Sequence, residues 1–167
     1  MITTTFYIFF GLVFLLVLSF ILNKILEKIL TGKKYHYFLI PGIMVHELSH
    51  ALACRLAGAK IREINFLSKN GGYVKYNSPK IPILGELLIN FAPILGGAGI
   101  LLFFFWLLNL DYRQPNLLSW QFWLFTYLAI SIIICLTPSK QDLKNSLTGI
   151  LIIFILLLII YFLGFFF

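Results

Sequence analysis

The stretch VHELSHALACRLAG, residues 45–58, places three ionisable side chains inside a run that otherwise reads as an apolar helix. His46, Glu47 and His50 form an HExxH pattern. Positions i and i+4 of a helix lie on one face about one turn apart, so both imidazoles can reach one Zn²⁺ ion. Glu47 then lies beside the ion as a general base rather than as a ligand. The spacing therefore predicts a catalytic zinc site on this helix, with one ion per chain.

The composition around this motif is that of an integral membrane protein. Hydrophobic residues make up 60% of the 167 residues and charged residues 11%, against roughly 45–50% and 25% in globular chains. Ionisable residues at membrane depth are costly and are usually functional, which favours a metal over two packed histidines. The net charge of +7 indicates no nucleic-acid partner, because the Lys and Arg residues lie between apolar runs, as topology signals do.

Five apolar stretches are long enough, or nearly so, to cross a bilayer as helices. We therefore expect an all-α polytopic membrane protein that forms a single domain over residues 1–167. Its core is expected at about 38–145, with an extra helix at each end. The expected spans are residues 5–22, 37–56, 83–108, 117–136 and 147–166.

The loop between the second and third spans contains GGYVKY, residues 71–76. The alternation after KNGG predicts a short β-hairpin or a single strand. An exposed strand edge can hold an unwound substrate segment as an added strand, which makes Gly72 and Tyr73 candidate substrate-binding residues. The alternative is a hairpin whose tyrosines lie at the membrane surface.

The distribution of Lys and Arg predicts the orientation of the chain. The loops after the second and fourth spans carry most of these residues and would face the cytoplasm, whereas the lysines of the first loop oppose that orientation. We expect the plasma membrane of a prokaryote, with the active site toward its cytoplasmic side. The residues in favour are Arg55, Lys60, Arg62, Lys69, Lys75, Lys80, Lys140 and Lys144, and those against are Lys24, Lys28, Lys33 and Lys34.

A third metal ligand is needed, because a catalytic zinc ion usually has three protein ligands and a water. Asp142 follows the fourth apolar run, on the side where the HExxH helix is expected to end. Glu86, near the start of the third run, is its rival. Glu86 has a second possible role, which is to hydrogen-bond a ligand histidine. The residues alone leave both acids open.

Three segments resemble the site-2 protease family of intramembrane zinc metalloproteases. They are VHELSHALACRLAG, GGYVKY and NFAPILGGAG (residues 90–99), the last followed by a helix that ends near an aspartate. The resemblance implies zinc ligation by His46, His50 and Asp142, with Glu47 as the catalytic carboxylate. It also makes Asn90 a candidate substrate contact.

The chain departs from the family pattern at two places and lacks its accessory domains. Leu143, rather than a glycine, follows the aspartate, and Gly96 stands where the family has an asparagine. No PDZ-like or CBS-like domain is recognisable, so the resemblance implies a minimal member.

We therefore expect a zinc-dependent intramembrane endopeptidase that hydrolyses peptide bonds with metal-activated water. Its partners would be a membrane protein or peptide as substrate and the lipid bilayer. The alternative is a non-catalytic membrane scaffold or chaperone of the same fold that binds transmembrane segments. A degenerate protease should lose Glu47 first, and its presence favours the enzyme. The sequence indicates no oligomeric state.

Overall fold

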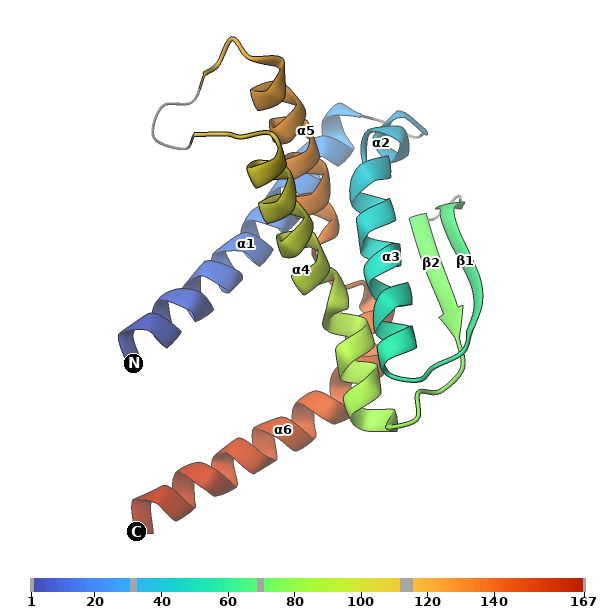
Figure 1. The fold of residues 1–167 in the computed structure, drawn as a ribbon. Helices are drawn as coiled ribbons and strands as arrows, with labels where there is room; N and C mark the ends of the chain where they lie inside the picture. Colours follow the sequence, from blue (N-terminus) through green and yellow to red (C-terminus); the bar gives the residue numbers. More distant parts are fainter. Residues whose placement is uncertain (1, 31–32, 69–70, 112–115, 167) are drawn as a thin grey trace.

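The computed structural model describes residues 2–30, 33–68, 71–111 and 116–166. These residues form a helical protein with one β-hairpin (Figure 1). The elements are α1 (Ile2–Ile29), α2 (Lys33–Phe38), α3 (Ile40–Leu56), β1 (Ile61–Ser68), β2 (Gly71–Tyr76), α4 (Pro82–Leu107), α5 (Trp120–Cys135) and α6 (Lys140–Phe166).

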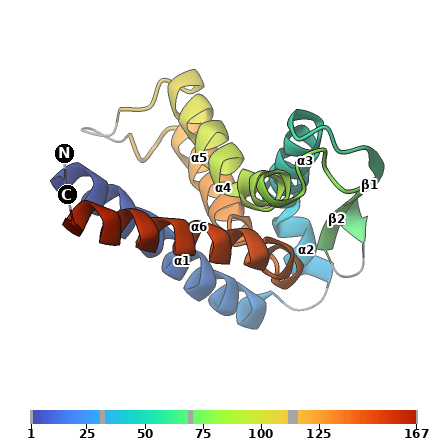
Figure 2. The same ribbon diagram turned by 90° about the horizontal axis from the view of Figure 1, so that it is seen from below.

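Helices α3, α4 and α5 form the centre of the molecule. α4 lies along α3, and α5 packs against both (Figure 1). α1 packs on α5 and α6 packs on α4. These two outer helices then run away from the centre, and both termini lie on the same side of the molecule (Figure 2). The HExxH helix, α3, therefore contacts α4, α5 and the hairpin.

Glycines let α3 approach its neighbours closely. A Cβ on Gly42 of α3 would lie 2.1 Å from the carbonyl oxygen of Ser131 in α5. A Cβ on Gly96 of α4 would lie 2.0 Å from Ser49 Oγ in α3. Close approach through small residues is common between membrane helices. It brings the face of α3 that carries the motif directly against α4 and α5.

The loop after α3 is an antiparallel hairpin that packs against α3 (Figure 1). Of the two expected forms, a β-hairpin or a single strand, the structure has the hairpin. The turn expected at residues 69 and 70 lies outside the described residues. Glu63 pairs with Lys75 in the register, and Asn65 pairs with Tyr73. Glu63 accepts hydrogen bonds from Tyr73 Oη at 2.6 Å and from Lys75 Nζ at 2.8 Å. These two contacts lower the pKa of Glu63, with the larger effect from Lys75.

The expected helices have different bounds in the structure. α1 and α6 are longer than the expected stretches 5–22 and 147–166. The stretch 37–56 is divided at Leu39 into α2 and α3, and Pro41 lies in the first turn of α3, where a missing N–H costs no helical bond. The stretch 117–136 begins later, at Trp120, because Ser119 caps α5 by accepting from the backbone N–H of Phe122.

The expectation of about five membrane spans is not confirmed. Among the described residues, α4 is the one helix that is long and apolar enough to cross a membrane by length and composition, and α5 is apolar but shorter. Large apolar side chains nevertheless point outward from α4, including Leu95, Leu102 and Trp106, each more than 70% exposed. Such outward-facing apolar surface suits lipid as the surrounding solvent.

Candidate metal centre

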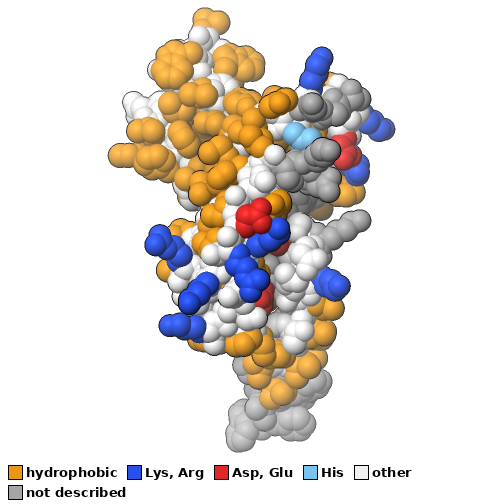
Figure 3. Space-filling view, turned by 90° about the vertical axis from the view of Figure 1, so that its right-hand side faces the viewer, with side chains coloured by type: hydrophobic (Ala, Val, Ile, Leu, Met, Phe, Trp, Pro, Cys, Tyr) orange, Lys and Arg blue, Asp and Glu red, His pale blue; other side chains and the backbone are white. Residues whose placement is uncertain are grey.

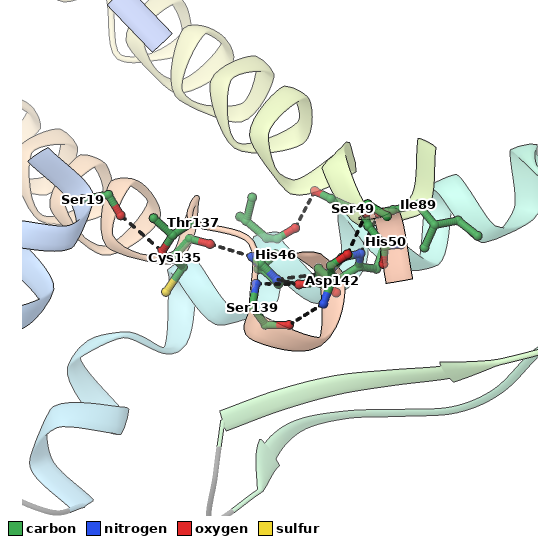
Figure 4. Close-up of polar contacts among 12 residues, drawn as sticks. Ser19, His46, Ser49, His50, Ile89, Cys135, Thr137, Ser139 and Asp142 are labelled. Carbon is green, nitrogen blue, oxygen red and sulfur yellow. Dashed lines mark hydrogen bonds and ion pairs between the residues drawn. The ribbon is translucent and has the colours of Figure 1, made fainter. Parts of the chain in front are cut away.

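Helix α3 places His46 and His50 one turn apart with their ring nitrogens facing each other. The two Nε2 atoms lie 3.0 Å apart. Each ring is oriented through its other nitrogen (Figure 4). His46 Nδ1 donates to the carbonyl oxygen of Cys135 at 2.5 Å, and His50 Nδ1 donates to that of Ile89 at 2.7 Å. Since a carbonyl only accepts, each ring carries a proton on Nδ1, and its neutral form presents a bare Nε2 lone pair.

This arrangement favours a cation between the rings. Two unprotonated nitrogens at 3.0 Å repel each other unless a positive charge lies between them. Metal-binding histidines commonly donate their second nitrogen to a carbonyl, which fixes the tautomer that the ion requires. The carbonyls of Ile89 in α4 and Cys135 at the end of α5 therefore hold both rings in the form that binds a metal.

Asp142 brings a carboxylate to the same place from the first turn of α6. Its Oδ2 lies 3.9 Å from His46 Nε2, and its Oδ1 lies 3.7 Å from His50 Nε2. Ser139 fixes this carboxylate by a reciprocal cap, in which Ser139 N donates to Asp142 Oδ2 at 2.7 Å and Asp142 N donates to Ser139 Oγ at 3.1 Å (Figure 4). Ser139 thus fixes the orientation of the Asp142 carboxylate.

The three side chains fit a zinc ion. One ligand atom from each of His46, His50 and Asp142 lies within 4.8 Å of the other two. Ligand atoms about 2.0–2.1 Å from a tetrahedral ion lie about 3.4 Å from one another. The Nε2–Nε2 distance of 3.0 Å and the distances from the two Nε2 atoms to Asp142, 3.7 Å to Oδ1 and 3.9 Å to Oδ2, lie on either side of this value. Two imidazoles and one carboxylate are also a ligand set typical of catalytic zinc, with a fourth position left for water.

Glu47 lies beside this group and is buried, with 5% of its surface exposed. Its side chain packs against β2, where a Cβ on Gly72 would come within 2.5 Å of Glu47 Cγ and 2.7 Å of Glu47 Oε1. Strand β2 therefore passes directly over the carboxylate that follows the first histidine.

Glu86 lies in a different set of contacts. Its carboxylate accepts hydrogen bonds from Tyr76 Oη at 2.8 Å and from Asn90 Nδ2 at 3.3 Å. Burial, followed by the bond to Glu86, raises the pKa of Tyr76, which keeps the phenol protonated as the donor. The structure thus brings Asp142 to the two histidines and uses Glu86 to join β2 to α4.

The three candidate substrate-binding residues have different surroundings in the structure. Gly72 lies against Glu47. Asn90 is buried on α4 beside Glu86, one residue after the carbonyl that orients His50. Tyr73 is bound through its hydroxyl to Glu63 on the neighbouring strand. Of the three, Gly72 is the one in contact with the motif helix at Glu47.

Sequence reasoning missed Ser139 and the carbonyls of Ile89 and Cys135. The Ser-x-x-Asp spacing of residues 139–142 is a capping pattern and could have indicated that Asp142 is fixed at a helix start. Every residue has a carbonyl, so no sequence signal could have identified the two that orient the histidines.

Comparison with family models gives a match to the family described as Peptidase M50B-like over residues 12–166. Neither the curated proteins nor the solved structures contain a match to this chain.

Proposed function

Because the chain belongs to the Peptidase M50B-like family, a site-2 protease family whose members are membrane proteins, we propose that it is a zinc-dependent intramembrane endopeptidase. The observation that carries this proposal is the convergence of His46, His50 and Asp142 beside the buried carboxylate of Glu47. The three residues would hold one zinc ion. When bound, the ion would polarise the substrate carbonyl and acidify water.

Glu47 would perform the proton transfers of the reaction. A carboxylate next to the first metal-binding histidine can accept a proton from the attacking water. It can then return that proton to the nitrogen of the departing peptide segment as the amide bond breaks. Its burial keeps bulk solvent away, which strengthens electrostatic interactions in the site.

Strand β2 would hold the substrate. A transmembrane helix hides its carbonyls in its own hydrogen bonds, so it must unwind before hydrolysis. In the described residues, β1 pairs with one edge of β2 and the sheet has no third strand. An unwound segment added to the other edge would pass Gly72 and therefore Glu47. Because residue 72 has no side chain, the substrate segment could lie close to Glu47.

The substrate would be a membrane-embedded or membrane-adjacent peptide. We infer that five helical segments cross the plasma membrane of a prokaryote, with the active site toward the cytoplasmic side. The support is the outward-facing apolar surface and the Lys and Arg residues at the end of α3 and the start of α4.

The test is cleavage by zinc-loaded protein in liposomes. Candidate substrates come from quantitative proteomics, as membrane peptides that accumulate in a strain carrying Glu47→Gln. These peptides should be cut by the parent protein, and cutting should stop after chelation. If no membrane peptide accumulates in the Glu47→Gln strain, or if the loaded parent cuts none of those that do, the chain is the non-catalytic scaffold instead.

A further inference from the structure

Two adjoining cavities lie at the end of the bundle where α3 ends and α4 begins. The first, of about 370 Å³, is lined at its polar end by Arg55 and Lys80. The second, of about 640 Å³, runs between α4 and α6 and is lined by leucine, isoleucine and phenylalanine side chains alone. Leu84 and Leu88 line both cavities, so the cationic one lies next to the apolar one.

The two cations are held together by the backbone. Lys80 N donates to the carbonyl oxygen of Ala57 at 3.1 Å, which joins the end of α3 to the start of α4. The Lys80 stem lies over Gly58, whose positive φ of +68° and missing side chain leave room for it. The positive charges of Arg55 and Lys80 thus belong to one short corner of the chain.

These charges have no internal counter-charge. Among the described residues, neither Arg55 nor Lys80 forms an ion pair. The lining of the first cavity contains no Asp or Glu in the same part of the chain. On one face of the molecule, Lys and Arg side chains gather with Asp and Glu side chains among them, below a broad area of hydrophobic side chains (Figure 3). Leu84 and Leu88 line the first cavity together with Arg55 and Lys80. An anionic group would therefore find two free cations next to apolar surface.

The apolar cavity is built by the crossing of α4 and α6. A Cβ on Gly149 would lie 2.6 Å from Leu87 Cδ1, so this glycine sets a close approach of the two helices. Beyond that contact, Phe91 and Phe154 line a groove in which the described side chains offer no hydrogen-bonding partner. Such a groove suits a hydrocarbon chain.

We propose that these cavities form a binding site for one anionic phospholipid, with its phosphate on Arg55 and Lys80 and an acyl chain along Leu84 and Leu88 between α4 and α6. The charge complementarity at one end and the wholly apolar lining at the other select this occupant. Basic pockets between membrane helices bind anionic headgroups in this way. An uncharged apolar peptide helix would fill the groove and leave the two cations without a counter-charge.

The test is a titration of the purified full-length protein with phosphatidylglycerol and phosphatidylcholine, with bound lipid counted by native mass spectrometry. We expect one phosphatidylglycerol per chain, bound at least tenfold more tightly than phosphatidylcholine. The double variant Arg55→Gln/Lys80→Gln should remove that preference. The double variant Lys28→Gln/Lys34→Gln removes the same amount of charge from exposed lysines elsewhere. It should keep the preference for phosphatidylglycerol.

A second pair of variants tests the groove. Leu84→Trp should weaken phosphatidylglycerol binding severalfold by filling the groove, whereas Leu95→Trp, at another exposed leucine of α4, should not. Inorganic phosphate should not compete at millimolar concentration. Equal binding of both lipids, full competition by phosphate, or an unchanged Arg55→Gln/Lys80→Gln variant would each overturn the proposal. Zinc content reports separately on folding and on the metal centre, so this proposal and the protease proposal can fail independently.

Discussion

Gly72 of the hairpin lies directly against Glu47 of the motif helix, so close that a Cβ at residue 72 would come within 2.5 Å of Glu47 Cγ. The same Cβ would lie 2.8 Å from Cγ2 of Ile43, one turn earlier on α3. The strand can therefore pass over the carboxylate at this distance because residue 72 has no side chain. In the proposed reaction, this contact sets how near a substrate held on β2 comes to Glu47.

Gly72→Ala should lower cleavage at least tenfold while zinc content stays at the parental level. The added methyl group must displace either β2 or Glu47, and overpacking of this kind costs about 1–3 kcal/mol of stability. Cleavage rate and zinc content are measured on the same preparation. Gly99→Ala is the matched control, because a Cβ there meets nothing within 4 Å. A Gly72→Ala protein with parental activity would show that β2 does not set the approach to Glu47.

Asp142→Ala should release zinc, whereas Glu86→Ala should retain it. Asp142 lies 3.7 Å from His50 Nε2, while the carboxylate of Glu86 is bound to Tyr76 and Asn90. Metal content after dialysis against a weak chelator measures the difference, and we expect at least a tenfold loss of affinity in the first variant. The reverse pattern would transfer the ligand role to Glu86.

Glu47→Gln should keep the zinc ion and lose cleavage by a factor of at least about 100, because general acid–base catalysis commonly contributes about 10²–10⁴-fold. The amide retains the shape of the buried side chain but cannot accept the proton. Glu27→Gln makes the same chemical change on an exposed residue of α1 and should cleave at the parental rate. Equal rates for Glu47→Gln and the parent would remove Glu47 from the mechanism.

Gly96→Ala should destabilise the packing of α3 on α4 by about 1–3 kcal/mol, because its Cβ would lie 2.0 Å from Ser49 Oγ. Removing that side chain with Ser49→Gly should recover part of the loss, with a coupling of at least about 0.5 kcal/mol in a double-mutant cycle. Unfolding in detergent gives the four free energies. In the control cycle, the changes in unfolding free energy caused by Gly99→Ala and Ser49→Gly should be additive. If the changes caused by Gly96→Ala and Ser49→Gly are additive too, the contact between residues 96 and 49 is contradicted.

The part of the site that lies on one helix could be predicted from the sequence, because its geometry is local. His46 and His50 share a helical face by their spacing alone. The residues alone leave both Asp142 and Glu86 as candidates for the third ligand, and the resemblance to site-2 proteases points to Asp142. Its position depends on where α5 ends and on the Ser139 cap that starts α6, neither of which the hydropathy of the chain reveals.

The membrane arrangement was predictable only in outline. Apolar runs identify helical stretches, but they do not mark a break such as that at Leu39, which depends on Pro41 in the first turn of α3. They also do not separate a helix that crosses a bilayer from one that packs along another helix. The family match confirms the resemblance found in the sequence. Among the described helices, α4 meets the length and composition of a span.

The central claim is that His46, His50 and Asp142 hold one zinc ion, and elemental analysis of protein purified without chelators tests it most directly. The parent should contain about one zinc per chain, and His50→Ala should contain almost none, with His36→Ala as a control for a histidine outside the site. A parent protein that binds no zinc even after incubation with excess metal, while it remains folded, would contradict the account.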